Sequence, residues 1–193
     1  MVHVSDIPNP YVLPADLPAP VDDGAADHLE GMRIPTIALP STSGADVYLA
    51  TVAGGTLVLY LYPRTGRPGE PLPEGWDDIP GARGCTPQSC AFRDHFADLR
   101  ALGADVLGLS AQSLEDQVEF AERVGLPYPI LSDPELELAA ALRLPTFEVA
   151  GMRLYRRHTL IARDSRIAKV FYPVFPPDRN AADVAAWLED HGA

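Results

Sequence analysis

A continuous apolar run at residues 56–62, Thr-Leu-Val-Leu-Tyr-Leu-Tyr, constrains the fold of this chain more than any other feature. The run is rich in residues that favour strands, and Pro63 ends it. A strand that is apolar at every position has both faces covered, which is typical of the central strands of an α/β sheet. Residues 104–110 form a second such run after a helical pattern. We therefore predict an α/β fold with a mixed central sheet flanked by helices on both faces.

Periodicity and turn residues predict the remaining elements. Helices are expected where apolar side chains recur every three or four residues, and Ser113 and Gly125 mark the two ends of one of them. In chain order, the sequence predicts short strands within residues 36–49, a strand at 56–62, helix 85–102, strand 104–110, helix 113–125, strand 128–131, helix 133–142, a hairpin of 154–160 and 167–171, and helix 180–190. One domain accounts for all of them, because 193 residues suit a single core.

Two segments rich in proline and glycine interrupt this pattern. Residues 1–33 carry five prolines between positions 8 and 20, which exclude a long helix. We expect them to form an extended arm on the surface of the domain at residues 34–193. Residues 64–84 form a long loop inserted into that domain, and Trp76 and Ile79 favour a packed loop over a floppy one.

The charge of the chain excludes two classes of partner. Fifteen basic and 27 acidic side chains give a net charge of −12, whereas nucleic acids and anionic membranes require a positive surface. The sequence also contains no signal-peptide pattern and no apolar run long enough to span a membrane. We therefore expect a cytoplasmic protein that binds neither nucleic acid nor membrane.

The only two cysteines, Cys85 and Cys90, lie five residues apart where a loop becomes a helix. Free N–H groups and the helix dipole stabilise a thiolate at such a start, so Cys85 is placed to be a nucleophile. An inert buried pair is the alternative reading. Metal binding is disfavoured, because the chain has no further cysteine and no close histidine pair to complete four ligands. We expect no metal and no cofactor.

The segment Gly-Cys-Thr-Pro-Gln-Ser-Cys-Ala-Phe-Arg-Asp at residues 84–94 resembles the peroxiredoxins, and most closely their bacterioferritin-comigratory, or Q-type, branch. The resemblance continues through residues 108–110, 120–133 and 170–175, and covers roughly residues 34–190. It implies a thioredoxin-like fold and a thiol-dependent peroxidase that reduces hydrogen peroxide or organic hydroperoxides. Cys85 would be the peroxidatic cysteine and Cys90 the resolving one. A thioredoxin-like or other dithiol reductant would recycle a monomer or weak homodimer.

The resemblance also implies an arginine beside the reactive thiol. When the family spacing is carried over onto Leu160 and Ile161, it places that arginine at Arg156. Arg157, as the next residue, is then expected on the opposite side of the strand. Arg83, two residues before Cys85, is a further possible cation.

One part of the family pattern is missing. The family reads Pro-x-x-x-Thr-x-x-Cys, but Ala82 stands where the threonine hydroxyl would bind the peroxide. We expect the loop at residues 64–84 to split this motif, to cap the site, and to return the hydroxyl through Thr65, with Thr86 as a weaker substitute. The missing threonine leaves a second function open, a non-enzymatic redox sensor or interaction module that uses the same cysteine pair.

Overall fold

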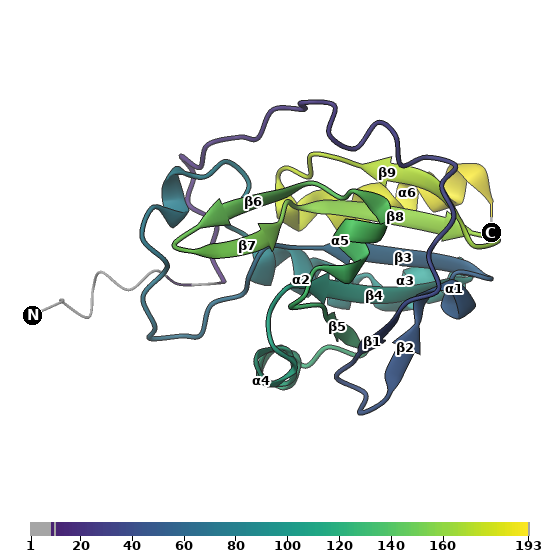
Figure 1. The fold of residues 1–193 in the computed structure, drawn as a ribbon, viewed down its shortest axis with the longest axis horizontal. Coiled ribbons are helices and arrows are strands. Elements are labelled where there is room, and N and C mark those ends of the chain that lie inside the picture. Colours follow the sequence, from purple (N-terminus) through teal and green to yellow (C-terminus); the bar gives the residue numbers. More distant parts are fainter. Residues whose placement is uncertain (1–8, 10, 193) are drawn as a thin grey trace, which may run out of the picture.

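The computed structural model describes residue 9 and residues 11–192, and it is built around a five-stranded mixed sheet. The strand order is β5-β4-β3-β8-β9, which Figure 1 shows at the centre of the molecule. Strands β3, β4 and β5 run parallel, β8 is antiparallel to β3, and β9 is antiparallel to β8. The prediction of a mixed α/β sheet is therefore confirmed. The strands are β3 (Thr56–Leu61), β4 (Ala104–Ser110), β5 (Ile130–Ser132), β8 (His158–Arg163) and β9 (Arg166–Phe171).

Both faces of the sheet are covered, which explains the unbroken apolar run in β3. Leu57 and Leu59 belong to a core layer with residues of α1 (Leu49–Val52) and α5 (Glu137–Leu142). Val58 points to the other layer. Each of these β3 side chains is at most 1% exposed, and burying one stabilises the fold by about 1.5–3 kcal/mol. The second layer contains residues of α2 (Cys85–Asp94), α3 (Phe96–Ala101), α4 (Leu114–Val124) and α6 (Asn180–His191).

Two elements depart from the predicted pattern. The expected strand at 154–160 covers the end of one strand, a break at residues 156–157 and the start of β8. Its first part belongs to a separate hairpin of β6 (Thr146–Val149) and β7 (Met152–Tyr155), because Tyr155 pairs with Thr146 rather than with the main sheet. The expected helix at 85–102 is divided at His95 into α2 and α3. A further small hairpin joins β1 (Ala38–Pro40) to β2 (Asp46–Tyr48).

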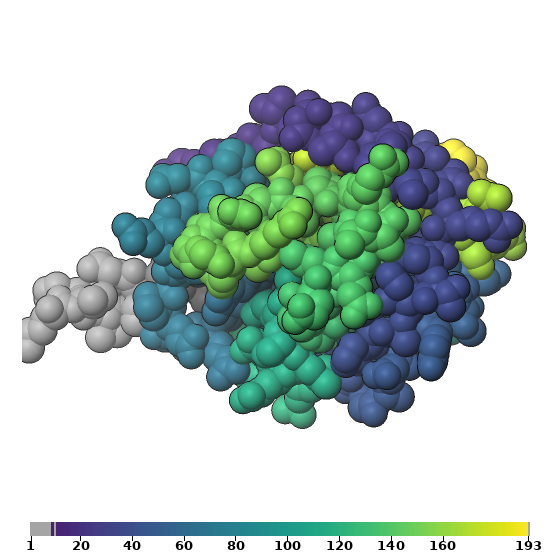
Figure 2. Space-filling model, viewed as in Figure 1, coloured from purple at the N-terminus to yellow at the C-terminus, as the bar shows by residue number. Residues whose placement is uncertain are grey.

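The N-terminal arm follows the outside of the domain and then enters its core. Figures 1 and 2 show it in purple and dark blue, crossing the molecule above the sheet. It is tied to the domain by the Tyr172 hydroxyl, which donates to Asp23 at 2.8 Å, and by a 2.9 Å bond between His28 and the Leu142 carbonyl. Leu29 is fully buried in the core. Of the residues that we assigned to the arm, 1–8 and 10 lie outside the described residues.

The loop at residues 64–84 is packed against the domain. It contains the short 3-10 helix η2 (Trp76–Asp78), and Trp76 is 3% exposed with its ring 6.3 Å from that of Phe147. A second 3-10 helix, η3 (Pro177–Arg179), leads into α6 and lies against α2. In the described part of the chain, none of the helices has the length and apolar character needed to cross a bilayer.

Candidate active site

Cys85 is the first residue of α2, as the sequence predicts. Gly84 before it caps the helix with a φ of 98°, a left-handed conformation that favours glycine. A side chain is also excluded there by space, because a Cβ atom on Gly84 would lie 2.3 Å from Pro177 and 2.8 Å from Leu13 of the arm. The chain therefore enters α2 through a tight turn between the arm and η3.

The sulfur of Cys85 lies against a buried guanidinium. Arg157 Nη2 is 3.2 Å from Cys85 Sγ, and each of the two residues is 3% exposed. The sulfur also lies 3.6 Å from the carbonyl oxygen of Ala82, to which a protonated thiol can donate. The sulfur therefore lies beside a guanidinium at the start of α2.

Backbone carbonyls and an amide hold Arg157 in this position. Its Nη2 lies 3.3, 3.2 and 3.0 Å from the carbonyl oxygens of Gly81, Ala82 and Arg83, which share its two N–H groups with the sulfur, and its Nη1 donates to Gln88 Oε1. Among the described residues, no carboxylate forms an ion pair with Arg157. A buried cation without a carboxylate is costly. Cys85 is the ionisable group that lies against this cation.

A chain of buried polar side chains extends from Arg157 to α6. Gln88 Nε2 donates to Asn180 Oδ1 at 3.0 Å, and the same oxygen accepts from Thr159 Oγ1 at 2.7 Å. All three of these side chains are at most 2% exposed. Among the described residues Arg157 Nε has no hydrogen-bond partner, so the bonds of Nη1 and Nη2 set the orientation of the guanidinium.

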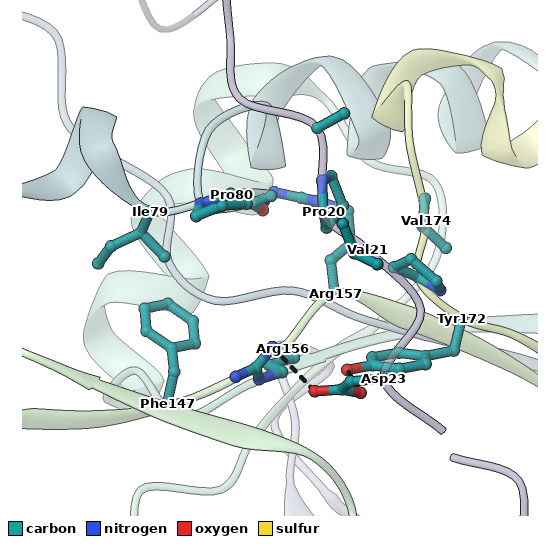
Figure 3. A pocket seen from close by; sticks show the side chains of 13 residues that line it. Pro20, Val21, Asp23, Ile79, Pro80, Phe147, Arg156, Arg157, Tyr172 and Val174 are labelled. Carbon is teal, nitrogen blue, oxygen red and sulfur yellow. Dashed lines mark hydrogen bonds and ion pairs between the residues drawn. The ribbon is translucent and has the colours of Figure 1, made fainter. Parts of the chain in front are cut away.

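The prediction that Arg156 lies beside Cys85 and Arg157 on the opposite side is wrong. Arg156 is 45% exposed in its side chain and pairs with Asp23 of the arm at 3.5 Å, as Figure 3 shows. The reason is the alternation of side chains along β8. Thr159 lies opposite Tyr60 of β3, on the face that α2 covers, and Arg157 is two residues before Thr159. A slip of one residue in the carried-over spacing moves the arginine to the other face.

The Thr65 hydroxyl is engaged by a residue other than Cys85. Thr65 is buried, and its hydroxyl donates to Gln112 Oε1 at 3.1 Å. A small hollow opens next to Cys85, and Thr86 is among its lining residues while Thr65 is not. Arg83 forms an ion pair with Asp77 at 2.5 Å and contributes only its carbonyl oxygen to the arginine site.

Cys90 occupies a different environment on the same helix. It is half-buried, and burial is the main effect that raises the pKa of its thiol above the ordinary value, with nearby Asp94 acting in the same direction. Arg93 and Arg123 oppose this shift without cancelling it. At neutral pH Cys90 is therefore protonated, and Cys85, beside Arg157, is the thiol placed to react first. Both cysteines are free in the structure.

Sequence reasoning missed Gln88, Thr159 and Asn180. Gln88 lies one helical turn after Cys85, so the i, i+3 spacing could have placed both side chains on one face of α2. Asn180 and Thr159 carry no such local signal, because the packing of α6 against α2 brings Asn180 to Gln88, and Thr159 joins them from β8 through its bond to Asn180.

Comparison with known proteins gives one consistent answer. The Redoxin family matches residues 29–188. Peroxiredoxin bcp1 of Schizosaccharomyces pombe is 31% identical over 157 residues, which cover 80% of this chain and 72% of that protein. A chloroplastic peroxiredoxin Q of Suaeda salsa is 27% identical over 160 residues, which cover 83% and 67%. The matches to two relatives from Mycobacterium tuberculosis strains span 61% of their length.

Solved structures agree with the sequence relatives. Peroxidoxin BcpB of Mycobacterium tuberculosis superposes with a TM-score of 0.70 at 25% identity, over 86% of this chain and all of that one. Peroxiredoxin Q of Xanthomonas campestris has the same fold, with a TM-score of 0.64 at 22% identity over 92% and 99% of the two chains. These matches extend over the sheet, the helices and the cysteine site. With its thioredoxin-like fold and a cysteine at the start of α2, the chain belongs to the peroxiredoxins, oxidoreductases that reduce peroxides with a thiol, and it resembles their Q-type branch.

Proposed function

We propose that this chain reduces hydroperoxides through Cys85, with Cys90 as the resolving thiol and a thioredoxin-like or other dithiol protein as the reductant. The contact that carries the proposal is the 3.2 Å approach of the buried Arg157 guanidinium to the Cys85 sulfur. Thr65, whose hydroxyl is bonded to Gln112, has no direct part in the reaction that we propose. Cytoplasmic location and a monomeric or weakly dimeric state remain predictions.

In the first step the thiolate attacks one oxygen of the peroxide. The S–O bond forms and the O–O bond breaks, so sulfur is oxidised by two electrons and the leaving oxygen departs as hydroxide or alkoxide, which takes up a proton to give water or an alcohol. Arg157 stabilises the thiolate before the attack and lies next to the negative charge that develops on the peroxide oxygens. Backbone N–H groups in the first turn of α2 add donors there.

In the second step the Cys90 thiol attacks the sulfenic acid on Cys85. The S–S bond forms, the S–O bond breaks, and water leaves. A dithiol reductant then exchanges with this disulfide through a mixed disulfide, which restores both thiols and oxidises the reductant. The raised pKa of Cys90 suits this order of events, because a protonated Cys90 does not compete with Cys85 for peroxide.

Two cysteine variants test the proposal. Cys85→Ser is expected to abolish peroxide consumption in a thioredoxin-coupled assay. Cys90→Ser is expected to consume one equivalent of peroxide and to leave a sulfenic acid on Cys85, which a dimedone-type reagent traps for mass spectrometry. A Cys85→Ser protein that still consumed one equivalent would reverse the two assignments. Wild-type protein that reacts once but is not turned over by any dithiol reductant would favour the redox sensor instead.

A further inference from the structure

We infer that the walls around Cys85 select hydrogen peroxide over hydroperoxides that carry a bulky organic group. This inference rests on the proposed function and adds the substrate class. It comes from the size of the hollow beside the sulfur and from the segments that close it. Part of its lining comes from the N-terminal arm and from the inserted loop at residues 64–84.

The hollow is very small. The space open to the centre of a water-sized sphere is about 30 Å³. One water needs about 10–15 Å³ by this measure, so the hollow holds about two water-sized groups. Hydrogen peroxide consists of two oxygen atoms and fits this space, whereas a tert-butyl or cumyl group is too large for it and has to lie at the open side of the hollow, against its rim.

Apolar side chains from outside the sheet form part of the walls. The inserted loop contributes Leu72 and Trp76, and the arm contributes Val12. Leu72 packs next to Gly66 of the same loop. A Cβ atom on that glycine would lie 3.7 Å from Leu72 Cδ2. Residues 82–86, which include the sulfur, and the charged loop residues Arg64, Arg67 and Glu70 complete the lining.

One arginine of α4 holds the arm and the loop together over the site. Arg123 donates to the Tyr11 hydroxyl of the arm at 2.8 Å and to the Gly66 carbonyl of the loop at 3.0 Å. Glu119 pairs with Arg123 at 2.7 Å and lies 3.9 Å from Arg67 of the loop. The two walls are therefore fastened to the same helix, which keeps the hollow narrow.

A larger pocket nearby does not offer a second route to the sulfur. It measures about 330 Å³ and is lined by apolar residues of the arm and of the segment before α2, among them Pro20, Ile79 and Pro80 (Figure 3). Arg157 reaches this pocket, but Cys85 is not among the lining residues that the structure describes. Arg157 also contacts the backbone carbonyls at residues 81–83, of which Gly81 lines this pocket, whereas Ala82 and Arg83 line the hollow beside the sulfur.

The test compares three peroxides of increasing size. The reduced full-length protein is mixed with hydrogen peroxide, tert-butyl hydroperoxide or cumene hydroperoxide, and the second-order rate constant of thiol oxidation is measured for each. We expect cumene hydroperoxide to react roughly 100-fold more slowly than hydrogen peroxide. In the double variant Val12→Ala, Leu72→Ala this ratio is expected to fall roughly tenfold. The control Val21→Ala, an exposed arm residue that lines only the larger pocket, is expected to keep the wild-type ratio.

A second variant changes the hollow in the opposite direction. Gly66→Ala adds one methyl group at ordinary contact distance from Leu72, so the loop can accept it. It is expected to slow tert-butyl hydroperoxide more than hydrogen peroxide. Equal wild-type rates for the three peroxides, or an unchanged ratio in both wall variants, would overturn the size selection alone. A wild-type protein that reacts with none of them would overturn the proposed function and the selection with it.

Discussion

Formation of a disulfide between Cys85 and Cys90 is expected to open the first turns of α2. Both residues lie on one continuous helix, Cys85–Asp94. Five residues of α-helix rise about 7.5 Å and turn about 140° past one full revolution. A disulfide requires Cα atoms within about 7 Å and sulfurs that face each other. The helical conformation therefore excludes the bond.

The contacts at the start of α2 set the magnitude of this opening. Opening the turn gives up the contact between Cys85 and Arg157 and three hydrogen bonds of Gln88, which join it to Arg157, Asn180 and the Gly84 carbonyl. At about 1 kcal/mol for each contact, opening costs about 4 kcal/mol in the reduced protein. The open form is then on the order of one molecule in a thousand. Once the disulfide forms, the open form becomes the only one.

Hydrogen exchange measures this change directly. Amides in residues 85–91 are expected to lose roughly 1,000-fold protection in the oxidised protein, while the amides of α4 keep theirs. Cys90→Ser treated with peroxide is the control, because it carries the oxidised sulfur but no disulfide, and it should stay protected. An oxidised monomer with a mapped Cys85–Cys90 disulfide and unchanged exchange at residues 85–91 would refute the reasoning. A disulfide between two chains would remove its premise.

Three further predictions concern the site and its supports. Arg157→Ala should slow the reaction of reduced protein with hydrogen peroxide about 100-fold, whereas Arg156→Ala should change this rate less than about threefold. Stopped-flow measurement of the rate constant of thiol oxidation tests this prediction. Similar losses in both variants would show that the contact between Arg157 and the sulfur does not matter. Burial lowers the pKa of His158 to about 4 in the folded protein. The contribution of neutral His158 to the free energy of unfolding is therefore fully present above its unfolded pKa of about 6.5, and about 3 kcal/mol of it is lost as the pH falls to about 4. Urea unfolding at a series of pH values should show this loss, and His158→Phe should remove that part of the pH dependence. Gly84→Ala should lower the free energy of unfolding by about 2–5 kcal/mol, because it adds both backbone strain and a steric clash. Gly75→Ala should lower it by only about 1–2 kcal/mol, because Gly75 has a similar φ but open space around it. Equal unfolding midpoints for the two variants would contradict the contribution of the clash.

The main sheet could be predicted from the sequence because its signals are local. Strands β3 and β4 are mostly apolar, with residues 57–61 and 106–109 buried, since both faces of these strands are covered. The β6–β7 hairpin escaped prediction because exposed charges at Glu148 and Arg153 interrupt its apolar pattern. Its turn places Ala150 at a φ of 48°, a conformation that alanine rarely signals.

The position of Cys85 could also be predicted from local sequence signals, whereas the position of Arg157 could not. Gly84 and Pro87 around Cys85 mark the start of a helix in any context. The choice between Arg156 and Arg157 depends instead on the register of β8, which is set by the pairing of Thr159 with Tyr60, far away in the chain. A periodicity of two gives alternating faces but does not say which face meets α2.

The N-terminal arm matters both for truncation of this chain and for the evolution of its substrate range. The family match begins at residue 29, yet Leu13 packs on the turn before Cys85 and Val12 lines the hollow beside it. A fragment trimmed to the family boundary would retain the sheet and the cysteines but expose the sulfur to larger molecules. An evolutionary lineage could retune its substrate range by editing a few codons upstream of the domain, without touching a single core residue.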